Sequence, residues 1–248
     1  MRMVRKAGLH VIRFSVLSYL ILYCVLNLRF KNLTVLFKHI GSSNSQIFQD
    51  LMVISMISNT DSLDNFYFVE FGATDGISIS NTYLFESVFG ANGIVAEPAK
   101  IWHDSLSANR QCSISHQCVW EKSGEVLEFL ETSNPDLSGL TNQQDKSRET
   151  VGSVEYSVDT ISLNDLLRKF AAPNRIEFLS IDTEGSEYRI LKSLNFNEFK
   201  FKVIVCEHNY GENRERIRQL LESNGYTRRH KLFSYFDDWY FLNSTNLE

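Results

Sequence analysis

The fold is decided by residues 66–76, which have the sequence Phe-Tyr-Phe-Val-Glu-Phe-Gly-Ala-Thr-Asp-Gly. The run before the first glycine is aromatic and β-branched apart from one acid, which is typical of a short buried strand. Gly72 and Gly76 both lack a Cβ atom, so this loop can adopt positive φ angles and let a ligand approach the backbone. Ser80 or Asn81 then caps a helix. Strand, glycine loop and helix together predict the first unit of a nucleotide-type α/β fold.

Two acids beside this loop distinguish between two classes of ligand. A dinucleotide-binding loop has the spacing Gly-x-Gly-x-x-Gly and holds a pyrophosphate at a helix N-terminus. Here the spacing is Glu-x-Gly-x-x-x-Gly, and Glu70 and Asp75 would repel a phosphate. A carboxylate at this position suits a cationic ammonium or sulfonium group, such as S-adenosylmethionine carries. The loop therefore favours that cofactor and makes a nicotinamide-dependent oxidoreductase the weaker alternative.

A third acid, Glu97, ends the next predicted strand, which begins at Gly93. It follows the last glycine of the loop by about 20 residues, the offset at which a carboxylate binds ribose hydroxyls in nucleotide folds. The alternative is that Glu70 and Glu97 are ordinary acids at a solvated strand end. Paired with the glycine loop, Glu97 favours a nucleoside-containing ligand.

Titratable residues gather again after two later predicted strands, residues 176–181 and 201–206. Five follow these strands: Asp182, Glu184, Glu187, Glu207 and His208. A helix N-terminus attracts acids, which explains part of this cluster without any function. In an open α/β sheet, however, the ligand crevice lies outside the carboxyl ends of the strands. We therefore expect Asp182, Glu207 and His208 to project there together with Glu70 and Glu97.

Composition excludes some classes of protein. The chain has 248 residues, 43% of them hydrophobic, which is enough for one large domain and a short extension. Its net charge of −5 and isoelectric point near 5.7 give no indication of a nucleic-acid partner. The four cysteines have neither the spacing of a metal site nor that of a disulfide framework.

The N-terminal segment is apolar from residue 9 to residue 28 and is interrupted by Arg13. It is a candidate membrane anchor, and the preceding basic residues favour an N-terminus inside the cell. No small-residue cleavage site follows, which argues against a removed signal peptide. The alternatives are an interfacial helix, or a helix packed on the globular domain of a cytoplasmic protein. The predicted organisation is an apolar segment over residues 1–31, a linker over 32–45 and one domain over 46–248.

The remaining elements follow from periodicity and turn residues. We predict helices, strands and one mobile loop that covers a substrate, in this order: a helix over 46–57, a helix over 101–109, a strand over 112–120, an extended segment over 125–130, the loop over 131–153, a helix over 158–170 capped by Asp159 or Ser162, a helix over 214–224 and a terminal hairpin from Tyr226 to Leu242.

Eight short motifs stand in order along the chain: Ser45-Gln46 with Gln49-Asp50, residues 68–76, Ser80-Asn81-Thr82, Glu97-Pro98, Asn109-Arg110, residues 179–187, Glu207-His208-Asn209 and Gly225-Tyr226. Jointly they resemble the FkbM-type family of S-adenosylmethionine-dependent methyltransferases. The resemblance covers roughly residues 45–241 and leaves out the N-terminal segment. Thr74 departs from the family, which more often has Asn at this position.

The resemblance implies a class I methyltransferase fold, which is Rossmann-like and doubly wound, with a mostly parallel seven-stranded sheet whose last strand is antiparallel. It also implies O-methylation of a hydroxyl on a sugar, a glycan or another small molecule. The residues that it implies for cofactor binding are Glu70, Gly72, Ala73, Asp75, Gly76, Asn81, Glu97, Pro98 and Asp182. By the same resemblance, Asp182 lies near the reactive methyl group.

The catalytic candidates are Asp182, His208 and Glu187, and we expect Asp182 or His208 to be the base that removes the hydroxyl proton. A variant of this mechanism has Asp182, Glu184 and Glu207 hold a divalent cation that lowers the pKa of the hydroxyl, because hard cations prefer oxygen ligands. The alternative function is a membrane-tethered interaction or trafficking protein that retains the fold without turnover.

Overall fold

The computed structural model describes residues 2–57, 65–141 and 152–243. Two compact units make up the chain. The first comprises Met1–Phe66 and Ile77–Ala91, and the second comprises Tyr67–Gly76 and Asn92–Glu248. The first unit is helical, whereas the second contains the sheet and most of the titratable residues that the sequence singles out.

The first unit contains five helices in the residues that the structure describes: α1 (Arg2–Leu26), α2 (Phe30–His39), the short 3₁₀ helix η1 (Ile40–Ser42), α3 (Gln49–Ile57) and α4 (Tyr83–Phe89). The segment that we expected to be a linker, residues 32–45, is therefore helical over most of its length. Its apolar residues recur at helical spacing, and Leu36 is fully buried. Helix α1 includes residues Gly8–Leu26, which are long and apolar enough to cross a membrane by length and composition.

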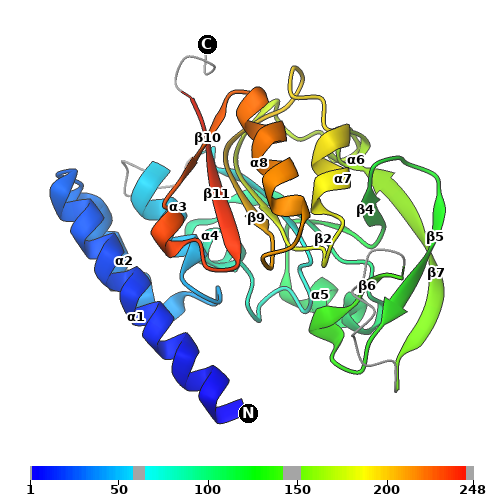
Figure 1. Ribbon diagram of the computed structural model, residues 1–248, viewed down its shortest axis with the longest axis horizontal. Coiled ribbons are helices and arrows are strands. Elements are labelled where there is room, and N and C mark those ends of the chain that lie inside the picture. Colours follow the sequence, from blue (N-terminus) through cyan, green and yellow to red (C-terminus); the bar gives the residue numbers. More distant parts are fainter. Residues whose placement is uncertain (1, 58–64, 142–151, 244–248) are drawn as a thin grey trace. The chain divides into compact units, whose positions relative to one another are not determined.

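The second unit is built on a mixed seven-stranded sheet (Figure 1) with the order β10-β11-β9-β8-β1-β2-β3. Its strands are β1 (Tyr67–Phe71), β2 (Asn92–Ala96), β3 (Ser113–Ser115), β8 (Arg175–Ile181), β9 (Lys200–Glu207), β10 (Tyr226–Arg229) and β11 (Asp237–Leu242). The five strands from β9 to β3 in this order run parallel. The last strand, β11, is antiparallel to both of its neighbours, and its pairing with β10 confirms the terminal hairpin.

Three helices of the second unit pack on one face of this sheet: α6 (Leu163–Lys169), α7 (Glu187–Ser193) and α8 (Asn213–Ser223). Figure 1 shows them side by side. Their buried apolar side chains share one core with those of β1, β8 and β9, because parallel strands covered by helices need apolar residues at nearly every position. A further helix, α5 (His103–Asn109), follows β2. The doubly wound arrangement with helices on both faces stays a prediction.

A smaller sheet of four strands, with the order β4-β7-β5-β6, was not anticipated. It contains β4 (Cys118–Trp120), β5 (Val126–Glu131), β6 (Gly139–Leu140) and β7 (Val154–Ser162). The single strand predicted over 112–120 is thus wrong: β3 and β4 belong to different sheets, and the hydroxyl of Ser115 accepts a hydrogen bond from the backbone N–H of Gln117 between them.

The helix predicted from residue 158 begins later than expected. Residues 158–162 continue β7, and α6 begins at Leu163. Ser162 is its cap, because its hydroxyl accepts a hydrogen bond from the backbone N–H of Asp165 at 3.1 Å. Of the loop predicted over 131–153, the described part contains β6 and a 3₁₀ turn, η3 (Pro135–Leu137), and residues 142–151 lie outside the described residues.

Candidate functional site

The parallel strands bring four distant residues to one edge of the large sheet. Phe71 at the end of β1 pairs with both Ala96 of β2 and Ile181 of β8, and Ile181 pairs with Cys206 of β9. The residues that follow these four positions are Gly72, Glu97, Asp182 and Glu207. They lie at the carboxyl edge, where open α/β sheets bind ligands.

The glycine loop has the backbone conformation that its sequence predicts. Gly72 and Gly76 have φ angles of 76° and 84°. A Cβ atom on Gly72 would lie 2.0 Å from the backbone oxygen of Asp182, and one on Gly76 would lie 2.7 Å from Cγ of Arg110. Both positions therefore require glycine for space as well as for conformation.

Glu70 does not stand open to a cationic ligand as its sequence position suggests. It is buried, and its Oε2 atom lies 3.5 Å from Nη1 of Arg110, which is also buried. The same Nη1 donates a hydrogen bond to the backbone oxygen of Gly76 at 3.1 Å, and the guanidinium lies over the Phe68 ring. Arg110 thus connects the start of the loop with its end. The Asn109-Arg110 motif was the sequence signal for this residue, but it gave no role.

Glu97 connects the glycine loop with the turn after β2. Its Oε2 accepts a hydrogen bond from the backbone N–H of Thr74 at 2.9 Å, and its Oε1 accepts one from Ala99 at 2.8 Å. Burial raises the pKa of Glu97 to about 7, against the lowering effect of these two hydrogen bonds. Each carboxylate oxygen has a second lone pair, so hydroxyl donors can still bind there.

Residues of the smaller sheet extend this acidic environment. Asp136 in η3 raises the pKa of Glu97 through its charge, and burial followed by the charge of Asp75 raises the pKa of Asp136 itself. Glu131 accepts a hydrogen bond from the Tyr156 hydroxyl at 2.7 Å, and that hydroxyl accepts one from the backbone N–H of Lys100 at 2.9 Å. Sequence reasoning did not identify Asp136, because it lies in the turn between β5 and β6 of a sheet that was not recognised.

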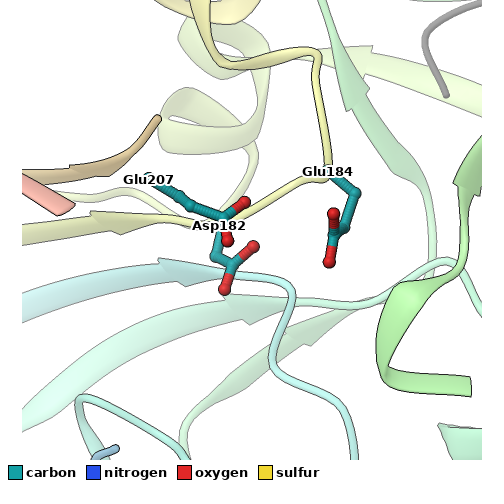
Figure 2. A group of neighbouring side chains, drawn as sticks. All are labelled: Asp182, Glu184 and Glu207. Carbon is teal, nitrogen blue, oxygen red and sulfur yellow. The ribbon is translucent and has the colours of Figure 1, made fainter. Parts of the chain in front are cut away.

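Asp182, Glu184 and Glu207 form the acidic cluster shown in Figure 2. One carboxylate oxygen of each lies within 4.8 Å of the others. Burial raises the pKa of Asp182 well above its ordinary range. The pKa of Glu207 is also raised, mainly by burial and to a smaller extent by the charge of Asp182. Two buried carboxylates in contact cannot both ionise freely, so this pair shares a proton.

Glu187 has a different place from the acidic cluster. Its Oε1 atom accepts hydrogen bonds from the backbone N–H of Thr183 at 3.0 Å, the hydroxyl of Thr183 at 3.0 Å and the backbone N–H of Gly185 at 2.9 Å. Glu184 and Gly185 between them have φ angles of 58° and 120°. Glu187 therefore fixes the turn that presents Glu184.

His208 belongs to another group of residues. Its Nδ1 atom accepts a hydrogen bond from the backbone N–H of Tyr210 at 3.0 Å, and its Nε2 atom lies 3.7 Å from Oδ1 of Asp238. Arg214 and Arg228 also bind Asp238. Burial lowers the pKa of His208 to about 4. The structure thus brings Asp182, Glu184 and Glu207 together, while His208 contacts Asp238.

Two of the residues implied for cofactor binding have no side-chain contact that assigns them a role. The backbone N–H of Ala73 donates to the oxygen of Ala96 at 3.4 Å, which holds the loop on β2. Pro98 lies between Glu97 and Ala99 in the turn after β2. Asn81 belongs to the first unit, and its part in cofactor binding stays a prediction.

Comparisons with known proteins identify one family. Residues 70–228 match the family model of the methyltransferase FkbM domain. A search of curated protein sequences found no significant match.

Three solved structures show similarity to this chain. Methyltransferase FkbM from Methylobacillus flagellatus is 14% identical, with a TM-score of 0.43 over 72% of this chain and 44% of that one. Precorrin-6y C5,15-methyltransferase from Geobacter metallireducens is 10% identical, with a TM-score of 0.41 over 77% of this chain and 84% of that one. The N-terminal domain of human METTL16 is 9% identical, with a TM-score of 0.38 over 78% of this chain and 65% of that one. The chain thus spans less than half the length of the first of these proteins.

Proposed function

Since this chain belongs to the FkbM methyltransferase family, we propose that it transfers a methyl group from S-adenosylmethionine to a hydroxyl of a sugar, a glycan or another small molecule. The observation that supports this best is the meeting of Gly72, Glu97, Asp182 and Glu207 at the carboxyl edge of the parallel strands. In this proposal the glycine loop shapes one side of the site, Glu97 binds hydroxyls of the cofactor, and the Asp182–Glu207 pair accepts a proton.

The glycine loop and Glu97 fit the proposed cofactor. The two glycines let the loop pack closely against Asp182 and Arg110, which holds the loop in one conformation. Beside it, Glu97 offers lone pairs to two ribose hydroxyls. Asp75 and Asp136 add negative charge beside it, which suits a cationic ligand. S-adenosylmethionine supplies an electrophilic methyl group on its sulfonium. In this proposal Arg110 holds the loop closed at both ends, and it takes the place opposite Glu70 that we had expected the ligand to occupy.

The Asp182–Glu207 pair is the proposed base. A neutral alcohol is a poor nucleophile, so a carboxylate that removes its proton during the transfer speeds the reaction by about 10²–10⁴-fold. Burial raises the pKa of both acids, and because the two carboxyl groups share one proton, one of them is ionised and can accept the proton of the hydroxyl. We therefore assign proton removal to this pair, because the lowered pKa of His208 and its contacts with Asp238 and Tyr210 make it a weak and occupied base.

A divalent cation is the second version of this mechanism. The oxygens of Asp182, Glu184 and Glu207 lie close enough together to bind one ion, and hard cations prefer such ligands. An ion there would displace the shared proton and lower the pKa of the acceptor hydroxyl. The two versions differ in their need for metal and in the part played by Glu184.

Isothermal titration calorimetry with S-adenosylmethionine tests whether the protein binds the cofactor. Assays of labelled methyl transfer to a panel of glycans and small alcohols then test the reaction. We expect saturable binding and an O-methylated product from at least one acceptor class. A full chain that is folded by circular dichroism but shows no heat of binding would instead support the alternative of a membrane-tethered interaction protein without turnover.

A further inference from the structure

Helix α1 packs on its own unit along one side. Val16, Leu20 and Cys24 recur every four residues on this side and are fully buried. Arg13 lies over the Phe48 ring and donates a hydrogen bond to the backbone oxygen of Ser45. The helix also contacts α2 and α3. Its inner side is thus fixed to the folded chain by both apolar and polar contacts.

The opposite side of α1 is also apolar, and its side chains are exposed. Val11, Phe14, Ser18, Leu22 and Val25 recur at intervals of three and four residues and form one line, which we call the outer stripe. Val11, Phe14 and Leu22 expose 67%, 71% and 55% of their surface. A surface helix of a water-soluble protein normally has polar residues on this side. The outer stripe therefore requires an apolar environment.

Hydroxyl groups on and beside the outer stripe bind to the helix itself. Ser18 Oγ donates to the backbone oxygen of Phe14 at 2.9 Å, and Ser15 Oγ donates to that of Val11 at 3.0 Å. In helix α2, Thr34 makes the same kind of bond to Phe30 at 3.2 Å. Such bonds satisfy a hydroxyl without water. The polar atoms of the stripe thus do not oppose contact with hydrocarbon.

The charge of this part of the chain indicates the chemistry of its partner. The first 49 positions contain seven basic residues and no acidic one, whereas the rest of the chain carries eighteen basic and thirty acidic residues. In helix α2, Phe30 and Phe37 expose more than half of their surface, and each is followed directly by a lysine, Lys31 and Lys38. Exposed apolar and basic residues together fit a surface of anionic lipid, which attracts basic groups and accepts apolar ones.

We propose that α1 lies in the plane of an anionic membrane surface with the outer stripe in the lipid, and that it does not cross the bilayer. A crossing helix would have to lose the packing of Val16 and Leu20 and carry Arg13 away from Ser45 into hydrocarbon. An in-plane helix keeps both contacts. The sheet-bearing unit then remains on the same side of the membrane as the start of the chain, where it meets water-soluble or lipid-surface acceptors.

Flotation of the full chain with preformed vesicles tests the attachment. We expect the protein to float with phosphatidylcholine vesicles that contain phosphatidylserine, and to float less with pure phosphatidylcholine or at high salt. The double variant Phe14→Glu/Leu22→Glu should lower the bound fraction by at least about tenfold. The control is Ser107→Glu, an exposed change elsewhere, which should leave the bound fraction unchanged. Wild-type protein that does not float, or a double variant that floats as well as the wild type, would overturn the proposal.

Cysteine labelling separates an in-plane helix from a crossing one. In a Cys112→Ser background, Gly8→Cys and Ser107→Cys each receive a membrane-impermeant maleimide after vesicle binding. A side chain at Gly8 meets nothing within 4 Å, so this change does not disturb packing. We expect both positions to label from outside the vesicles. Protection of position 8 alone would show a crossing helix.

The oligomeric state tests a second occupant of the outer stripe. If the wild type dimerises without lipid and the Phe14→Glu/Leu22→Glu variant is monomeric, the stripe binds a second copy of the chain. Both results contradict the proposal, and unchanged circular dichroism confirms that the variants fold.

Discussion

Gly72 lies directly against the backbone carbonyl of Asp182, and a Cβ atom on Gly72 would be 2.0 Å from that oxygen. The contact joins the end of β1 to the end of β8, whose last residues, Phe71 and Ile181, are paired. The glycine loop and the acidic cluster are therefore positioned by the same backbone contact. A change at Gly72 should disturb both.

Gly72→Ala tests this contact, and Gly124→Ala is its matched control. Both glycines have φ near 76°, but a side chain at Gly124 would meet nothing within 4 Å. Gly124→Ala should therefore cost only the strain of a positive φ, about 1 kcal/mol of unfolding free energy. Gly72→Ala adds overpacking and should cost at least about 2 kcal/mol more. Urea unfolding of both variants measures this, and equal losses would disprove close packing at Gly72.

Arg110→Met should destabilise the fold strongly, because it removes a buried positive charge 3.5 Å from the buried carboxylate of Glu70. Removal of one member of a buried pair costs about 3–5 kcal/mol. The double variant Arg110→Met/Glu70→Gln should recover part of this loss. The control is Arg189→Met, which removes an exposed ion pair with Glu121 and should cost less than about 1 kcal/mol. A double variant no more stable than Arg110→Met would show that the pair is not coupled.

Asp182→Asn and Glu207→Gln should each lower the rate of methyl transfer by about 10²–10⁴-fold, because each removes one carboxylate of the proposed base. The affinity for S-adenosylmethionine, measured by calorimetry, should change much less. His208→Gln is the control and should retain most of the rate, since His208 contacts Asp238 and not the acidic cluster. The assignment of the base fails if the His208 variant loses more activity than either acid variant.

Glu184→Gln and a chelator separate the two versions of the mechanism. If the Asp182–Glu207 pair acts alone, EDTA should leave turnover unchanged and Glu184→Gln should have an effect below about tenfold. If the three acids bind an ion, both treatments should abolish turnover, and added Mg²⁺ or Mn²⁺ should restore it after chelation. His208→Gln serves again as the control, because the His208 side chain contacts Asp238 and Tyr210.

Glu97 predicts a specific dependence of stability on pH. Its pKa is about 7 in the folded protein and 4.5 for an ordinary glutamate, so the folded state binds the proton more tightly than the unfolded chain. The stabilisation by protonation is therefore present below pH 4.5 and is lost as the pH rises to about 7. This loss is about 3 kcal/mol.

The comparison of wild type with Glu97→Gln isolates this effect, because other buried acids, such as Asp50 with its pKa raised to about 6, contribute equally to both proteins. Unfolding free energies at several pH values between 4.5 and 7 should show the wild type losing stability relative to the variant. A difference between the two proteins that is constant over this range would show that Glu97 has no raised pKa.

Local patterns identified the elements of the large sheet well. The glycines after β1, the cap of α6 at Ser162 and the hairpin of β10 and β11 all follow from short-range rules. The smaller sheet escaped prediction because β7 pairs with β4 and β5, which are distant in sequence. In addition, β5 has a single buried residue and the first four residues of β7 have none. Nothing local distinguishes the end of such a strand from the start of a helix.

Residue order alone is enough to name the candidates for the chemistry: two loop glycines and acids at the ends of four strands. Their partners follow only from the folded chain. Parallel register brought Asp182 and Glu207 together, whereas Arg110, far from Glu70 in the chain, neutralised Glu70. Residue type and spacing set the charge and direction of a side chain within its own element. Packing between elements decides which opposite charge or backbone group the side chain contacts. No periodicity along the chain indicates this.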